Sequence, residues 1–278
     1  MLEALRRHAV EYACEAACLG LFMISACAFS VALFHAESPV VAAVPDVLPR
    51  RALMGLAMGG TLISLVYSPI GRRSGAHMNP ALTLAFWRLK KVASADALFY
   101  AAAQFLGGLL GVLAARALLG AKVMHESVRF AVTVPGGAGE WAAFAGELAI
   151  TFVLMLTVLV VSNHPRLMRR TGLFAGALVA LYIAFEVPLS GMSMNPARTL
   201  ASAVHAGTYT SLWIYFVAPP LAMLLAAEAY VRRKGLAAVL CAKFDHPMDV
   251  PCPFRCSHAM AAAPDAAAAA EPAPNAVS

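Results

Sequence analysis

Two near-identical strings of eight residues carry the residue types that could interact with a small polar molecule. Both read Ser-Gly-x-x-Met-Asn-Pro-Ala, and they occupy residues 74–81 and 190–197. Asn is among the preferred N-cap residues of helices, and Pro is favoured at the first helical position, where its missing N–H costs nothing. Each string therefore predicts a helix start with an Asn amide at its N-terminus. The two predicted starts are Asn79-Pro80-Ala81 and Asn195-Pro196-Ala197.

These helix starts offer hydrogen bonds and partial positive charge rather than acid–base chemistry. The aligned peptide dipoles of a helix leave a partial positive charge at its N-terminus. If the two N-termini meet inside a membrane, they repel cations, while the amides of Asn79 and Asn195 can still bond to water. Arg198 directly follows the second string, and an arginine at membrane depth is costly and usually functional. We therefore predict a pore for uncharged molecules around these residues.

The elements that must position the strings are membrane-spanning helices. The chain has 278 residues, of which 61% are hydrophobic and 13% charged, and this is too apolar for a soluble protein. A helix needs about 20 apolar residues to cross a hydrocarbon core of about 30 Å. Stretches that reach or approach this length run over 9–34, 52–70, 97–121, 141–161, 171–189 and 212–231. The sequence predicts an all-α membrane protein with six transmembrane helices.

Two further apolar segments, 80–87 and 196–204, follow the strings and are too short to cross a membrane. Each comes after the second span of a three-span set, so we expect an internal repeat, with copies at about 9–121 and 141–231. An odd number of spans per copy means that the copies insert with opposite orientations. The short segments are therefore predicted to be re-entrant half-helices that enter from opposite faces.

The formal net charge of +6 comes from basic residues spread over alternate loops, which favours membrane orientation over a nucleic-acid partner. The outer loops hold mainly Arg50, Arg51, Lys122 and Arg129. The larger, inner set consists of Arg6, Arg7, Arg72, Arg73, Arg88, Lys90, Lys91, Arg166, Arg169, Arg170, Arg232, Arg233 and Lys234. The positive-inside rule then predicts a cytoplasmic N-terminus (1–8) and a cytoplasmic tail (232–278). The Ala/Pro-rich composition of the tail predicts disorder.

The two strings and their spacing resemble the aquaporin, or major intrinsic protein, family over roughly residues 9–231. The family's membrane glutamates match Glu15 and Glu147. The resemblance implies a homotetramer in a lipid bilayer, with one pore in each subunit and a narrow outer filter of four positions. Counting from the two strings without gaps places this filter at Gly59, Ile183, Met192 and Arg198.

The filter departs from the pattern of the family members that resemble strict water channels, which carry an aromatic residue and His where this chain has Gly59 and Ile183. Their loss predicts a wider and less polar constriction, which the flexible Met192 refills in part. Thr199 and the pair 215–216, Tyr-Phe, instead match the water-channel branch. We predict a passive channel for water with some leakage of small neutral solutes. The alternative is a facilitator for glycerol, urea or neutral metalloid hydroxides.

Glu15 and Glu147 each lie in the first span of one repeat. A re-entrant loop exposes backbone N–H groups that need acceptors, and a buried carboxylate supplies them. Membrane carboxylates also serve as proton relays, but support of the loops is the more economical role.

The sequence shows neither a nucleophile–base pair nor paired acids in its spans, so we expect no enzyme activity and no cofactor. A secondary transporter is the rival class, because inverted repeats and broken helices occur there too. Such transporters usually place ion-coordinating groups at the midplane, where this chain has Asn79 and Asn195. The short loops and the absence of a cleavable signal suggest a bacterial inner membrane.

The tail brings together residue types that bind metals. These are Cys241, His246, Cys252, Cys256 and His258. The Cys-x₃-Cys spacing is looser than the common zinc spacings. A metal or redox sensor that regulates the pore is one hypothesis, and tail thiols without a fixed role are the alternative.

Overall fold

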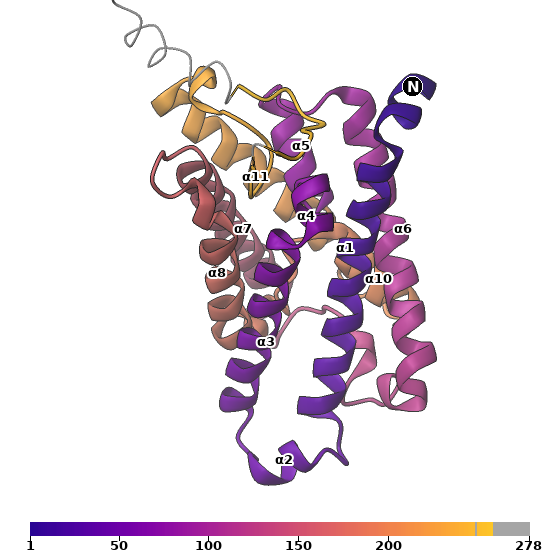
Figure 1. The fold of residues 1–278 in the computed structure, drawn as a ribbon. Helices are drawn as coiled ribbons and strands as arrows, with labels where there is room; N and C mark the ends of the chain where they lie inside the picture. Colours follow the sequence, from indigo (N-terminus) through magenta and orange to yellow (C-terminus); the bar gives the residue numbers. More distant parts are fainter. Residues whose placement is uncertain (248, 258–278) are drawn as a thin grey trace, which may run out of the picture.

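The computed structural model describes residues 1–247 and 249–257, and all regular structure within these ranges is helical. The described residues form a bundle of six long helices (Figure 1). They are α1 (Leu2–Phe34), α3 (Val47–Tyr67), α6 (Ser94–Leu119), α7 (Glu140–Ser162), α8 (Thr171–Phe185) and α11 (Leu212–Lys234). The predicted all-α class is confirmed, although α1 begins at Leu2, so that most of the segment 1–8 extends the first helix.

Five of these helices, or the helix with its adjoining turn, have the length and mean hydropathy of membrane spans. The exception is α3, which carries Arg50 and Arg51 near its start. Arg50 donates to the backbone carbonyls of Leu33 and Pro45, at 3.1 Å each, so its charge is held by the connection between α1 and α3. Since α3 packs lengthwise against α8 and also contacts α1, it completes the bundle.

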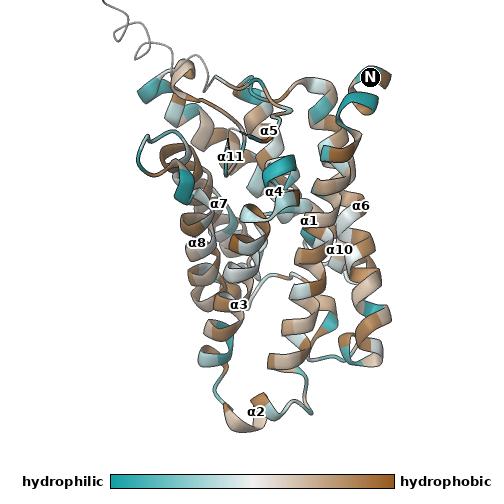
Figure 2. Ribbon diagram, viewed as in Figure 1, coloured by the Kyte–Doolittle hydropathy of each residue, from teal (hydrophilic) through white to brown (hydrophobic). Residues whose placement is uncertain are grey.

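Hydrophobic residues make up most of the length of the long helices, whereas hydrophilic residues gather toward the ends of the bundle (Figure 2). Leu106, Leu110 and Leu113 of α6, for example, are 55%, 52% and 51% exposed. Side chains of this kind are stable when they contact lipid or another apolar surface.

Glycines set the close approach of the most extensively packed helix pairs, which include α1 with α6 and α3 with α8. A Cβ atom on Gly107 would lie 2.2 Å from the carbonyl oxygen of Ala16, and one on Gly59 would lie 2.5 Å from that of Gly176. Both distances are too short for any side chain, so only glycine allows these backbones to touch.

Two short helices follow the repeated strings: α5 (Pro80–Arg88) and α10 (Pro196–Ala206). Figure 1 places α5 toward the end of the bundle that holds the N-terminus, and α10 further toward the opposite end. Both pack against α6 and α11, inside the bundle. The remaining described α-helices are the short elements α2 (Pro39–Ala43), α4 (Pro69–Ser74) and α9 (Val187–Ser190).

The segment after α11 folds back over the end of the bundle that also holds the N-terminus (Figure 1). Its backbone N–H groups bond to Asn163 Oδ1 from Leu240 (2.7 Å), to Gly75 O from Phe244 (3.3 Å) and to Lys91 O from Arg255 (2.9 Å). The predicted disorder is therefore wrong for the described part of the tail. Three loops that are distant in sequence satisfy its backbone, and composition does not report such contacts. The rest of the tail, with His258, lies outside the described residues.

Candidate pore

The two strings adopt the same unusual backbone conformation. Positive φ angles occur at the second, third and fifth residues of each: Gly75, Ala76, Met78, Gly191, Met192 and Met194. Residues other than glycine in this region cost about 1–3 kcal/mol each and persist only where their surroundings fix them. The match between the strings supports the predicted internal repeat.

Buried glutamates fix these loops from α1 and α7. Glu147 accepts from the backbone N–H groups of Ser193 (2.6 Å) and Met194 (2.7 Å), and from the Ser190 hydroxyl (2.9 Å). Glu15 accepts from the backbone N–H of Met78 in the other loop. Both glutamates are fully buried. They make the contacts that a loop-supporting role requires.

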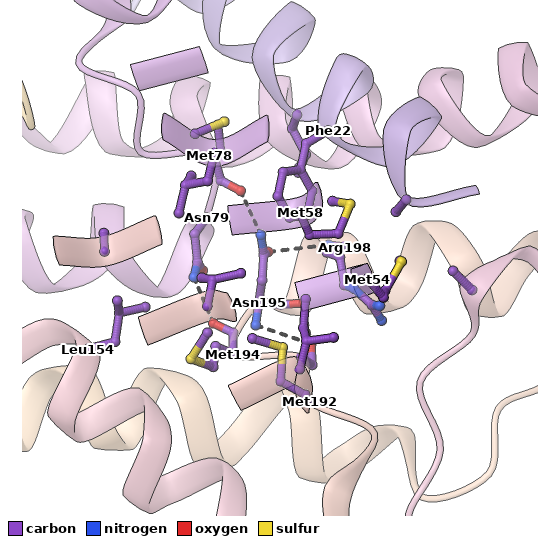
Figure 3. Close-up of a pocket in the computed structure, with 18 of the residues that line it drawn as sticks. Phe22, Met54, Met58, Met78, Asn79, Leu154, Met192, Met194, Asn195 and Arg198 are labelled. Atoms are coloured by element: carbon purple, nitrogen blue, oxygen red, sulfur yellow. Dashed lines mark hydrogen bonds between the residues drawn. The ribbon is translucent and has the colours of Figure 1, made fainter. Parts of the chain in front are cut away.

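Each Asn joins its own half-helix to the other loop. Asn79 Oδ1 accepts from the N–H of Ala81 at 2.9 Å, and Asn195 Oδ1 accepts from that of Ala197 at 3.0 Å, so both are N-caps. The amide nitrogens cross over: Asn79 Nδ2 donates to Met194 O at 2.7 Å, and Asn195 Nδ2 to Met78 O at 2.6 Å. The helix starts therefore meet, and their side chains lie beside one another (Figure 3).

A cavity of about 220 Å³ runs past this meeting point. It is lined by Asn79 and Asn195, by Phe34 and Arg51 toward the α2 end, and by Phe244 of the tail at the other end. Met54, Met58, Met78, Met192 and Met194 add flexible thioether side chains to its wall. The cavity thus extends along the bundle, with mostly apolar side chains in its wall.

Of the four predicted filter residues, Ile183, Met192 and Arg198 line the cavity, whereas Gly59 does not. Gly59 faces Gly176 of α8, and Met58 lines the cavity instead. Met58 directly precedes Gly59, and one residue along a helix turns a position by about 100° to another face. The spacing of Met54, Met58 and Leu62, four residues apart on one face, is the signal that could have identified this wall.

Arg198 lies in the first turn of α10, where its backbone N–H donates to Asn195 Oδ1 at 3.2 Å. The side chain extends along the cavity toward Met54 (Figure 3). Its Nη1 atom is buried and has no hydrogen-bond partner among the residues that the structure describes. The guanidinium therefore presents an uncompensated donor and a positive charge to the cavity.

Comparison with known proteins agrees with this architecture. The family model described as Major intrinsic protein matches residues 5–230. Aquaporin NIP2-2 from Zea mays is 37% identical over 173 residues, 62% of this chain and 57% of that protein. Aquaporin NIP1-3 from Oryza sativa subsp. japonica is 39% identical over 176 residues, 63% of this chain and 59% of that protein. The matches thus span less than two thirds of these relatives.

A solved structure shares the fold. The X-ray structure of the aquaglyceroporin from Plasmodium falciparum aligns with a TM-score of 0.62 and 22% sequence identity, covering 80% of this chain and 95% of that one. The tail after α11 lies beyond the family match.

Proposed function

Because the chain belongs to the major intrinsic protein family and is an integral membrane protein, we propose that it forms a passive transmembrane channel for water, with limited passage of small uncharged solutes. The observation that carries the proposal is the pair of crossed amides in the cavity. An Asn amide nitrogen has two N–H donors. Asn79 and Asn195 each use one for the opposite loop, which leaves one donor each for a molecule in the cavity.

The same geometry supports the exclusion of ions. The N-termini of α5 and α10 meet beside the cavity, and each carries about half a positive elementary charge. Arg198 adds a full charge to the same wall. A cation that enters loses its hydration and meets the positive charge of Arg198 and of the two helix N-termini, while water can exchange its hydrogen bonds for those of the amides.

The corrected filter favours water over larger solutes. With Met58 in place of Gly59, the proposed filter consists of Met58, Ile183, Met192 and Arg198. Three apolar side chains and one cation leave less room than the predicted glycine would. The second candidate is a facilitator for glycerol or urea. The observation that favours it is the mostly apolar wall of the cavity.

Stopped-flow swelling of proteoliposomes tests both candidates. Phe244 lines the inner end of the cavity, where its side chain can obstruct flux. The test therefore uses the unmodified chain and Phe244→Ala. We expect Phe244→Ala to give fast water flux that does not saturate and needs no energy source, with glycerol and urea much slower. Water flux no faster than that of protein-free liposomes in both preparations contradicts a channel. Saturable or energy-dependent flux identifies a transporter, and rapid glycerol or urea entry identifies the facilitator.

We further propose a homotetramer with both termini on the cytoplasmic side. The tetramer follows from family membership and suits the exposed leucines of α6. The orientation follows from the positive-inside rule, since Arg72, Arg73 and Lys91 lie at the end covered by the tail. The plant relatives give no support to a bacterial inner membrane, which stays a prediction.

The assignment of Met58 to the filter predicts a matched pair of outcomes. Met58→Ala removes a side chain from the constriction and is expected to raise the ratio of glycerol to water permeability. Gly59→Ala is expected to leave that ratio unchanged. It destabilises the fold by about 1–3 kcal/mol, as overpacking does, because the new Cβ lies 2.5 Å from Gly176 O. Swelling rates and thermal unfolding in detergent measure both effects, and the reverse pattern would restore Gly59 as the filter residue.

A further inference from the structure

Four side chains of the tail converge on one point. The ligand atoms of Cys241, His246, Cys252 and Cys256 all lie within 4.8 Å of one another. The sulfurs of Cys241 and Cys252 are 3.5 Å apart, and the Cys256 sulfur is 3.2 Å from His246 Nε2. The cysteines are spread over sixteen residues of sequence, so the fold of the segment brings the four together.

This arrangement has the dimensions of a tetrahedral metal site. Zn–S bonds of about 2.3 Å and Zn–N bonds of about 2.0–2.1 Å place two sulfurs about 3.8 Å apart and a sulfur and nitrogen about 3.6 Å apart. The measured separations of 3.5 and 3.2 Å need only small adjustments. A disulfide needs an S–S distance of about 2.05 Å, which is much shorter than the 3.5 Å between the Cys241 and Cys252 sulfurs. Three thiols and one imidazole suit zinc rather than calcium or magnesium, which prefer oxygen ligands.

We propose that Cys241, His246, Cys252 and Cys256 bind a zinc ion, and that this ion holds the tail across the inner mouth of the pore. Coordination releases the thiol protons to solvent and leaves three thiolates and a neutral imidazole around the metal. The site then carries one net negative charge. Lys243 compensates this charge, because it interacts electrostatically with the sulfurs of Cys252 and Cys241.

Two aromatic residues that alternate with the ligands connect the site to the pore. Phe244 lies between the first two ligands in sequence and lines the inner end of the cavity. Phe254 lies between the last two and stacks on His77 of the first re-entrant loop, with ring centroids 5.0 Å apart. His77 Nε2 also bonds to Ala242 O at 2.8 Å. A metal that fixes the four ligands therefore also fixes both aromatic rings over the mouth.

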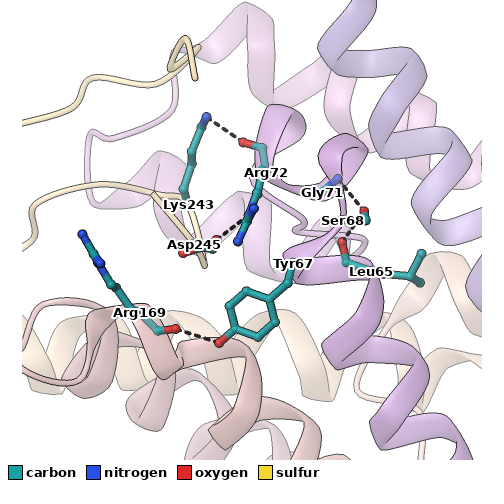
Figure 4. A network of polar contacts seen from close by, with 8 residues as sticks. All are labelled: Leu65, Tyr67, Ser68, Gly71, Arg72, Arg169, Lys243 and Asp245. Atoms are coloured by element: carbon teal, nitrogen blue, oxygen red, sulfur yellow. Dashed lines mark hydrogen bonds and ion pairs between the residues drawn. The ribbon is translucent and has the colours of Figure 1, made fainter. Parts of the chain in front are cut away.

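Polar contacts attach the same segment to α4, the short helix that follows α3 (Figure 4). Lys243 Nζ donates to Arg72 O at 2.7 Å, and Arg72 Nε pairs with Asp245 at 2.8 Å. These contacts are partly exposed on the arginine side, and exposed ion pairs contribute little to stability. The described tail has only one turn of regular helix, Leu236–Ala238. Metal-binding energy becomes folding energy, so the ion adds to the order that the buried side chains of Phe244 and Phe254 and the backbone hydrogen bonds already give the segment.

Metal analysis of the purified full chain tests the site without reference to transport. We expect one zinc ion per subunit after growth with Zn²⁺, and Co²⁺ substitution should give the absorption of a tetrahedral thiolate complex. Cys252→Ser and Cys256→Ser should lose the metal, whereas His246→Cys should retain it. Cys14→Ser, a half-buried cysteine of α1, is the matched control and should bind zinc normally.

Three results overturn the zinc site. The first is that unmodified protein, reduced and supplied with Zn²⁺, holds no metal. The second is that Cys14→Ser and Cys252→Ser lose zinc equally. The third is a disulfide between Cys241 and Cys252 in protein that was purified under conditions that retain bound metal. Size-exclusion profiles and helical circular dichroism of each variant show whether the bundle is intact, so that loss of metal is not confused with unfolding.

Water permeability tests the closure. We expect the unmodified protein with zinc bound to swell slowly. Chelation of its zinc should raise the swelling rate several-fold, and Cys252→Ser and Phe244→Ala should show the same higher rate without chelation. Fast swelling of Phe244→Ala, together with slow swelling of the unmodified protein that does not change on chelation, contradicts the metal-held closure but leaves the channel intact. If none of these proteins conducts water, the channel and the closure both fail, while the metal analysis still decides the zinc site.

Discussion

Replacing Glu147 with Leu is expected to destabilise the folded bundle strongly. The carboxylate accepts from the backbone N–H groups of Ser193 and Met194, and leucine accepts nothing. A buried donor left without a partner costs about 1–3 kcal/mol, so the two N–H groups together cost about 2–6 kcal/mol. The loop also loses the contact that holds Met194 at its positive φ of 55°. Thermal unfolding of detergent-solubilised protein measures the loss.

Glu147→Gln is the matched control, because it keeps one acceptor oxygen and nearly the same volume. It should unfold between the unmodified protein and Glu147→Leu. Glu15→Leu should act in the same direction, since Glu15 accepts from Met78 N–H and from Gln104 Nε2, the latter at 2.8 Å. Unchanged unfolding of Glu147→Leu would show that water in the cavity satisfies the loop and that the glutamate does not support it.

The parts of the site that follow local rules could be predicted from the sequence. An Asn followed by Pro defines a helix start through the N-cap bond and the fixed φ of proline. The half-helices begin at Pro80 and Pro196 as predicted. The repeat of the strings also predicted that the two half-helices lie end to end, because matched segments that enter a membrane from opposite faces bring their N-termini together. The crossed bonds of Asn79 and Asn195 go beyond this, since they depend on how closely the loops approach.

The first filter residue could not be predicted by counting. The face of α3 that meets the cavity is set by its contact with α8, where Gly59 lies against Gly176. A single sequence does not show this contact. Helical periodicity carried the missing information, because Met54 and Met58 lie one turn apart on a different face from the packing glycines Gly55 and Gly59.

The ordered tail was missed for a different reason. Its Ala/Pro-rich composition suggests no core of its own, and its buried residues, such as Val239, Phe244 and Phe254, instead join the core of the bundle. Its order comes from groups elsewhere in the chain: Asn163 after α7, Lys91 after α5 and Gly75 in the first string. Long-range contacts of this kind leave no local pattern, although the clustered cysteines and histidine were visible in the sequence.

The second large effect concerns Arg198, whose replacement by Leu is expected to admit cations. A unit charge at 4 Å in an effective dielectric constant of about 20 contributes about 4 kcal/mol, or about three orders of magnitude in occupancy. The dipoles of α5 and α10 remain, each about half a charge, so the rise in proton and potassium flux should stay below that limit. We expect water permeability to change much less, because both Asn amides are intact.

Arg198→Lys keeps the charge and is the control, and Phe244→Ala provides an open background for both variants. Proton and potassium fluxes into liposomes under an imposed diffusion potential measure the outcome. Cation flux in Arg198→Leu that stays at the level of Arg198→Lys would assign exclusion to the half-helix N-termini alone. A rise confined to Arg198→Leu would show that two aligned dipoles are insufficient, and that the buried guanidinium, whose Nη1 lacks a protein partner in the described chain, is placed there for its charge.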